Sequence, residues 1–122
     1  MKSRIVVLAC AALFAGAASA KAQQEVKIGV LYPLSGPVAQ IGIDAVAAVK
    51  TAVEIVNEGA DLPLALAKNK GLPGLNGAKV RLVIVDHQGK PEVGQSETER
   101  LITQEKVHAV FGAYFSSVTA EK

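Results

Sequence analysis

Hydrophobic and polar positions follow two patterns along residues 25–122. Three short segments are nearly continuous in apolar, mostly branched residues, which is typical of strands buried on both faces of a sheet. Two longer segments between them have apolar positions that recur every three or four residues, which indicates amphipathic helices. The expected strands are Val26 to Tyr32, Lys79 to Asp86 and Val107 to Phe111.

The first expected helix follows the turn at Pro37, because proline is tolerated in a first helical turn, and Gly59 ends it. The second runs from Pro91 to Lys106, and a third begins at Ser116 or Ser117. Valines three and four residues apart form the apolar face of the first helix: Val46, Val49, Val53 and Val56.

The order strand, helix, strand, helix, strand predicts an α/β fold, a βαβαβ series with a parallel sheet and right-handed crossovers. Ligands of open parallel sheets bind beyond the carboxyl ends of the strands, so the loops 33–40, 87–90 and 112–117 are the expected site. The connection from Glu58 to Ala78 precedes a strand, and we expect it to cover the amino-terminal rim of the sheet. Long connections are otherwise functional or mobile, and this alternative stays open.

The first 20 residues have the features of a secretory signal peptide. A basic start precedes an apolar stretch from Ile5 to Phe14, and small residues at a cleavage site end at Ala20. The uncharged run is shorter than the roughly 18 to 20 residues that a membrane-spanning helix needs. The sequence therefore predicts a signal peptide, residues 1–20, cleaved after Ala20, and one exported domain, residues 21–122.

Charge and cysteine content narrow the function further. The formal charge of +2 comes from Lys2 and Arg4 in the expected signal peptide, so the exported part is neutral overall and has no basic footprint for nucleic acid. The single cysteine, Cys10, also lies in the signal peptide. The exported part is therefore expected to rely on its core, without a disulfide.

The sequence has no motif for a cofactor, a metal or a catalytic nucleophile. It lacks a phosphate-binding glycine motif, a nucleophile elbow and any paired metal-ligand spacing. His87 and His108 are isolated, which is typical of structural or solvent-facing histidines. Asp86 ends a strand, where it is expected to orient the following loop, with catalysis as the alternative.

The segment from Gly112 to Ala120 is the most informative one. It leaves the third strand and starts a helix at Ser116 or Ser117, whose backbone N–H groups and hydroxyl suit an anion such as a carboxylate. Tyr114 and Phe115 precede the serines and are expected to form an apolar wall beside the anion. The alternative, that a serine only caps the helix, stays open at this point.

Four segments in order resemble the periplasmic binding proteins of branched-chain amino acid ABC transporters, in their amino-terminal part. The segments are Lys27–Gln40, Val85–Pro91, Glu97–Lys106 and Phe111–Ser117. The resemblance runs from about Glu25 to the last residue. It implies that residues 21–122 are a partial amino-terminal lobe of a type I periplasmic-binding-protein fold.

The resemblance further implies a hinged, two-lobed protein that is not an enzyme. Such a protein closes on a small amino acid or an amide-like ligand and delivers it to the membrane permease of an ABC transporter. By position, Ser116 would donate its hydroxyl and backbone N–H to the ligand carboxylate, with Ser117 as a neighbour or cap. Tyr114 and Phe115 would line the pocket, and Ile41 would face the ligand side chain.

The sequence departs from the family pattern in several places. Ile41 stands where members often have an aromatic residue, and Lys90 stands where an acidic residue commonly caps the helix. Gly89 and Phe115 occupy the positions that a disulfide joins in well-known members. The rest of the first lobe and the second lobe are not in the chain, so we expect a fragment or the product of an interrupted gene, with an open sheet edge.

Two other functions stay open. A ligand sensor of the same fold would use closure to signal to a receptor or regulator. An exported α/β enzyme would use Asp86 or Ser116 as a working group.

Overall fold

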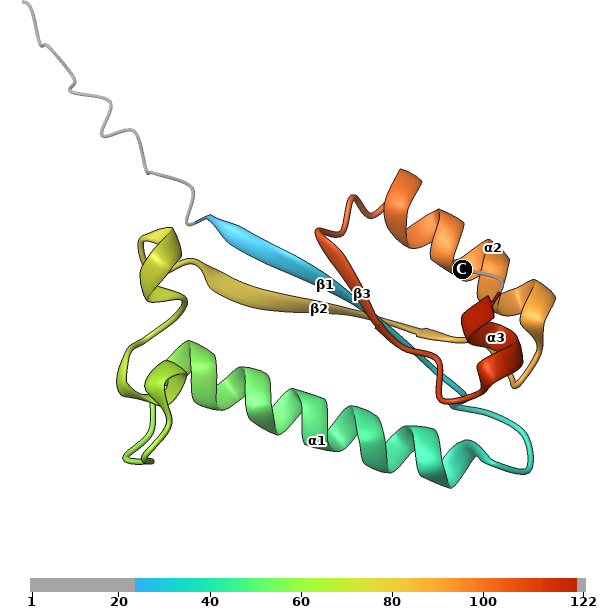
Figure 1. Cartoon of the computed structure of the whole chain (residues 1–122), viewed down its shortest axis with the longest axis horizontal. Helices are drawn as coiled ribbons and strands as arrows, with labels where there is room; N and C mark the ends of the chain where they lie inside the picture. Colours follow the sequence, from blue (N-terminus) through green and yellow to red (C-terminus); the bar gives the residue numbers. More distant parts are fainter. Residues whose placement is uncertain (1–23, 121–122) are drawn as a thin grey trace, which may run out of the picture.

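A computed structural model describes residues 24–120 as three strands and three helices in alternation, with two short 3₁₀ helices between α1 and β2 (Figure 1). The expected signal peptide, residues 1–20, lies outside the described residues. In chain order the elements are β1 (Glu25–Tyr32), α1 (Ala39–Glu58), η1 (Ala65–Lys68), η2 (Pro73–Leu75), β2 (Lys79–Asp86), α2 (Pro91–Thr103), β3 (Ala109–Gly112) and α3 (Ser116–Ala120).

The three strands form one parallel sheet in the order β2-β1-β3. Along β1, Glu25 pairs with Lys79 of β2 and Ile28 pairs with Ala109 of β3. All three strands therefore end at the same edge of the sheet, and the loops after them lie together there. The α/β fold with a parallel βαβαβ series, expected from the sequence, is confirmed.

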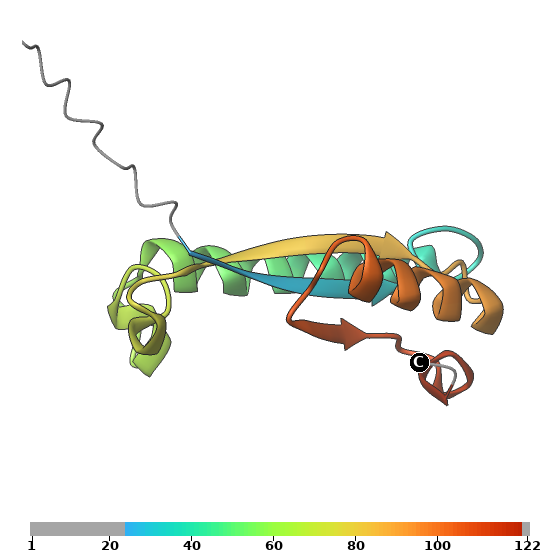
Figure 2. The same ribbon diagram turned by 90° about the horizontal axis from the view of Figure 1, so that it is seen from above.

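The helices lie on both faces of the sheet, as Figure 2 shows. α1 packs on one face, against β1 and β2, whereas α2 packs on the other face and α3 packs against α2. Side chains alternate between the two faces along a strand, so nearly continuous apolar strands supply both layers. The core cluster on the α2 face consists of Leu31, Val85, Leu101, Ala113 and Val118.

The end of α2 differs from the expectation. α2 ends at Thr103 and not at Lys106, and β3 begins at Ala109 and not at Val107. Lys106 adopts a left-handed φ of 55°, which breaks the helix. Val107 then donates its backbone N–H to Leu101 O (3.1 Å), so it closes the end of the helix instead of starting the strand.

The long connection between α1 and β2 lies at the amino-terminal ends of β1 and β2 (Figure 1). Ala67 in η1 is buried, and Gly71 donates its backbone N–H to Val56 O at the end of α1 (2.8 Å). The connection is thus packed onto the sheet rim opposite the expected site. No helix within residues 24–120 is long and apolar enough to cross a membrane.

Candidate ligand-binding site at the carboxyl edge of the sheet

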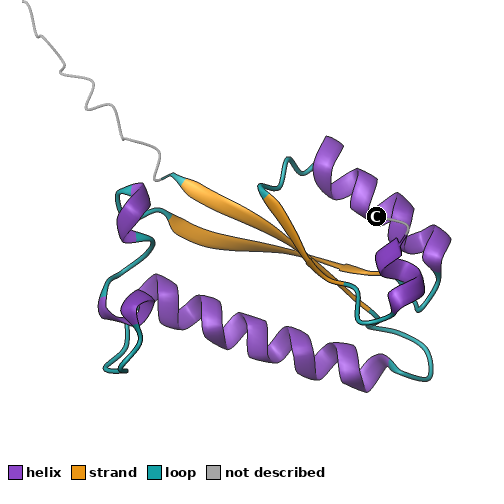
Figure 3. Cartoon of the chain, viewed as in Figure 1, coloured by secondary structure: helices purple, strands orange, loops and turns teal. Residues whose placement is uncertain are grey.

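Three loops follow the three strands at one edge of the sheet, and they are drawn in teal in Figure 3. They comprise residues 33–38 before α1, 87–90 before α2 and 113–115 before α3. This edge is where open parallel sheets bind their ligands, and it is the place that the sequence analysis predicted.

The loop after β1 is bound to the end of β2 through Asp86. Asp86 Oδ1 accepts the backbone N–H of Leu34 (2.8 Å) and, on its own loop, that of Gln88 (2.7 Å). On the α1 side, a Cβ on Gly42 would lie 1.9 Å from Pro33 O. Only a glycine at position 42 of α1 therefore allows the loop after β1 to approach the helix this closely.

The carboxyl group of Asp86 is adapted to this role. Burial opposes its ionisation, but hydrogen bonds from the Ser35 side chain and the backbone of Leu34 and Gln88, together with nearby His87, lower its pKa below the ordinary value of 3.8. The Oδ1 atom of the Asp86 carboxylate is thus already hydrogen-bonded to backbone amides of the two loops. This arrangement favours the orienting role over catalysis.

The loop after β2 is a tight turn over a buried histidine. Lys90 donates its backbone N–H to His87 O (2.8 Å), and Gln88 and Gly89 between them have φ values of 56° and 70°. The His87 side chain is fully buried, and its Nδ1 accepts the backbone N–H of Gly89 (3.0 Å). An isolated histidine was expected to be either structural or solvent-facing, and His87 is a buried, structural one.

The loop after β3 has an unusual backbone. Gly112, Ala113 and Tyr114 have φ values of 114°, 94° and 53° in succession. A Cβ on Gly112 would lie 2.3 Å from Leu31 O, and Ala113 donates its backbone N–H to the same oxygen (2.7 Å). The left-handed run turns the chain sharply from β3 into α3 and keeps it close to β1.

Ser116 and Ser117 open α3 at this edge, and both are exposed. The first helical hydrogen bond of α3 is donated by Thr119 to Phe115 O (3.0 Å), so the N–H groups of residues 116–118 precede the helical bonding. Neither serine hydroxyl is hydrogen-bonded to another described residue. Both hydroxyls, and the N–H groups of the exposed residues Ser116 and Ser117, therefore have no partner among the described residues.

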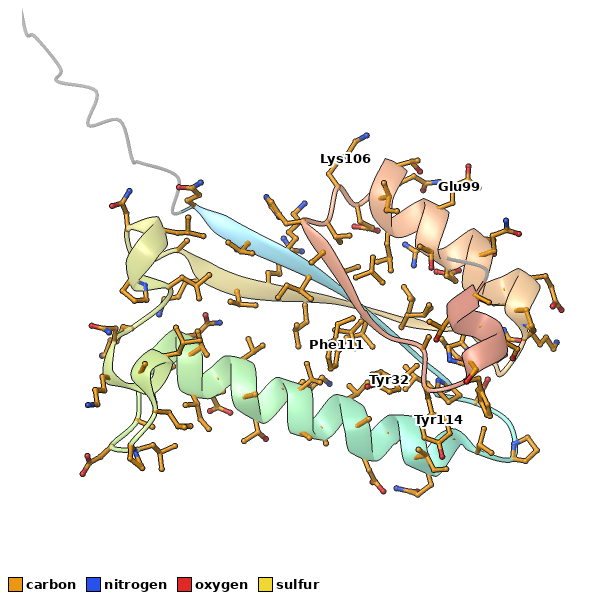
Figure 4. All side chains as sticks on the ribbon, viewed as in Figure 1. Tyr32, Glu99, Lys106, Phe111 and Tyr114 are labelled. Carbon is orange, nitrogen blue, oxygen red and sulfur yellow. The ribbon has the colours of Figure 1, made fainter. Side chains whose placement is uncertain are left out.

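Tyr114 and Phe115 differ in their exposure. Their rings meet edge-on with centroids 5.1 Å apart, but Tyr114 is 57% exposed whereas Phe115 packs against the core cluster. Figure 4 labels Tyr114 in the loop between β3 and α3. Its position suits contact with a solute, and that of Phe115 suits support of the loop.

Ile41 lies in the first turns of α1 and is 41% exposed. It is at the same edge of the sheet as Ser116, but α1 packs on one face of the sheet, whereas α3 packs against α2, the helix of the other face. No group of three His, Cys, Asp or Glu side chains within residues 24–120 is placed to bind a metal.

An apolar groove of about 500 Å³ lies away from these loops, on the α1 face. The residues that line it include Val26, Ile28, Val53, Val56, Leu66 and Phe111. It holds no polar group that would orient a charged solute, so the loop edge is the better candidate.

Comparison with known proteins decides the family. A sequence model of periplasmic binding proteins matches residues 25–121. The chain belongs to the periplasmic binding protein family. The Leu/Ile/Val-binding protein homolog 7 of Brucella melitensis is 37% identical over 117 residues, which are 95% of this chain and 25% of the relative. The homolog 3 of the same organism is 34% identical over 87 residues, 71% of this chain and 20% of the relative.

Solved structures of this family have the same fold. The branched-chain amino acid transporter substrate-binding protein LivJ of Streptococcus pneumoniae, in complex with isoleucine, superposes with a TM-score of 0.65 at 28% identity. The match covers 80% of this chain and 24% of LivJ. The leucine-binding protein LivK of Thermotoga maritima gives a TM-score of 0.59 at 25% identity over 79% of this chain and 23% of LivK.

The chain thus spans about a quarter of the length of the relatives it matches. The relatives and the family are substrate-binding proteins, which are not enzymes.

Proposed function

We propose that this sequence is the amino-terminal portion of the solute-binding component of an ABC importer for branched-chain or related amino acids. The observation that carries the proposal is the exposed start of α3 at the carboxyl edge of a parallel sheet. There Ser116 presents a hydroxyl and a backbone N–H that are not engaged by other described residues. The names of the relatives support an amino acid as the solute.

In this proposal Ser116 binds the carboxylate of the amino acid, because amides at a helix start and a hydroxyl donor favour a negative group. Ser117 is a neighbour or cap, and Tyr114 and Phe115 border the pocket. Ile41, on the opposite side, faces the ligand side chain. The second lobe is needed to close over the ligand, and the loaded protein delivers it to the membrane permease.

Export to the periplasm belongs to the same proposal. The expected signal peptide, residues 1–20, is removed after Ala20, so the mature protein starts at Lys21. Mass spectrometry of the exported protein measures this directly. A mature chain that retains residues 1–20 would contradict the cleavage site.

The test needs a chain that can close. We define the completed chain as this sequence joined to the remaining part of the Brucella melitensis homolog 7, with which it shares 37% identity. Calorimetric titration with leucine, isoleucine and valine measures binding. Ser116→Ala is expected to weaken binding by about 1 to 3 kcal/mol, because it removes a hydrogen bond to a charged group.

Ser96→Ala is the matched control, since Ser96 is an exposed residue of α2 whose hydroxyl donates to Val93 O of the same helix. It is expected to leave the affinity unchanged. If Ser116→Ala also binds with unchanged affinity, Ser116 is only a helix cap. The 122-residue chain alone is expected to show no rise in melting temperature with these amino acids, because binding to the native state would have to stabilise it.

A further inference from the structure

Residues at the carboxyl end of β2 bind the end of β1 and the loop that follows it. Asp86 Oδ1 accepts the backbone N–H of Leu34, a residue 52 positions earlier in the chain (2.8 Å). The next residue, His87, donates its backbone N–H to Tyr32 O, where β1 ends (3.2 Å). The end of the central strand and the loop leading to α1 are therefore attached to two adjacent residues of β2 and its loop.

The His87 side chain contacts the third loop. Its ring meets Phe115 edge-on, with centroids 6.1 Å apart and an interplanar angle of 77°. A Cβ on Gly89 would lie 3.7 Å from Phe115 Cε2, so the Phe115 ring rests on the turn that His87 organises. Phe115 is the residue before Ser116, and its place decides where α3 starts.

The loop between β3 and α3 depends on such support. Its left-handed φ values at Ala113 and Tyr114, 94° and 53°, are costly for residues with a Cβ and persist only where the surroundings impose them. Ala113 and Val118 are fully buried on either side of Phe115. Together with the Phe115 ring, they fix the chain in the conformation that exposes Ser116.

We propose that Asp86 and His87 are positioning residues of the ligand site, Asp86 for the loop 33–38 that leads to Ile41, and His87 for Phe115 and thereby Ser116. The inference rests on the proposed function and deepens it. Neither side chain touches the ligand. Each acts by fixing a loop before the ligand arrives, which lowers the ordering cost of binding.

The first test uses the completed chain and distinguishes two features of the His87 side chain: the ring that contacts Phe115, and the Nδ1 atom that accepts the Gly89 N–H. His87→Ala is expected to raise the dissociation constant about tenfold, because Phe115 loses the ring beneath it. His87→Phe keeps a ring against Phe115, and the exposed Gly89 N–H turns to water, so this variant should restore most of the affinity. His87→Asn keeps an acceptor near Nδ1 without the ring and should not restore it.

His108 supplies the matched control. Its Nδ1 accepts a backbone N–H, that of Lys27, at the same distance of 3.0 Å, but at the opposite rim of the sheet. His108→Ala is expected to leave the dissociation constant unchanged. A loss equal to that of His87→Ala would mean that any such histidine matters only for the fold, and would overturn the proposal.

Asp86 is tested by the same logic. Asp86→Ala removes the acceptor of the Leu34 N–H and should weaken binding, whereas Asp86→Asn retains an Oδ1 that accepts it and should restore part of the affinity. Equal loss in both variants would show that the carboxylate charge, and not its hold on the loop, is what matters.

Hydrogen exchange in the unliganded completed chain distinguishes this proposal from the proposed function. Faster exchange confined to residues 112–117 in His87→Ala, and to residues 33–38 in Asp86→Ala, supports loop positioning. If the parent binds none of the amino acids, the proposed function fails while these exchange results still decide the positioning claim. If the parent binds and His87→Ala changes neither exchange nor affinity, the positioning claim is wrong.

Discussion

The two faces of the sheet differ sharply in how well they are covered. On the α2 face, Leu31, Leu101 and Val118 are fully buried. On the α1 face, Phe111 of β3 is 51% exposed, and the groove of about 500 Å³ remains open between α1 and the sheet. The chain thus completes the packing beneath the loop that presents Ser116, and it leaves open the face that lies away from this loop.

This difference indicates where the described chain is well packed. α3 and its loop are anchored by buried side chains of the core cluster, among them Ala113 and Val118. The α1 face has apolar surface without a cover, which in soluble proteins marks an interaction surface or a tendency to associate. Substitutions on the two faces should therefore behave differently.

The largest effect is expected for Leu101→Ala. Leu101 is fully buried in the core cluster, so the truncation should cost about 2 to 5 kcal/mol of unfolding free energy. Urea denaturation of the completed chain measures it. Ile102→Ala, one residue further along α2 at a side chain that is 54% exposed, is the control and should change little. Equal losses would show that the α2 face is not a closed core.

Gly94→Ala tests the packing of α2 against α3. A Cβ on Gly94 would lie 2.5 Å from Val118 Cγ1, so overpacking should cost about 1 to 3 kcal/mol, more than the roughly 1 kcal/mol that alanine gains in helix propensity. The same denaturation experiment measures the loss. Gly74→Ala has nothing within 4 Å of its Cβ and should be neutral. A neutral Gly94→Ala would mean that α3 is free to move.

The fold followed from the sequence because its signals are local and agree with one another. β2 has the expected bounds, Lys79–Asp86, and α3 begins at Ser116, one of the two expected positions. The predicted end of α2 at Lys106 was wrong. The residue with a left-handed φ after the helix is Lys106, and only a glycine or asparagine would have indicated such a turn in the sequence.

The site was harder to predict for the same reason. Ala113 and Tyr114 have positive φ values that no glycine announces, and these separate Phe115, which packs inward, from Tyr114, which stays exposed. That both residues border the ligand stays a prediction. The contact between His87 and Phe115 could not be predicted, because it depends on tertiary structure that local patterns do not encode. The ligand roles of Ser116, Ser117 and Ile41 stay predictions.

A smaller effect on stability is expected on the open face. Phe111→Ser removes a half-exposed ring, so in the 122-residue chain it should cost less than about 1 kcal/mol and should reduce self-association in light scattering. Val83→Ser, at a side chain that packs against the core cluster and does not line the groove, should cost more and should not reduce association. If Phe111→Ser is the more destabilising of the two, the α1 face is already closed in this chain.

The smallest effect concerns the pH dependence at the site edge. Because the pKa of Asp86 is lowered in the folded protein, its contribution to stability is present above the ordinary value of 3.8 and is lost as the pH falls through the lower folded value. Denaturation between pH 2 and 5 should therefore be less pH-dependent in Asp86→Asn than in the parent, as roughly one titrating group is removed. If Asp86→Asn has the same slope as the parent, the Asp86 contacts to the loop after β1 contribute nothing to the stability of this edge.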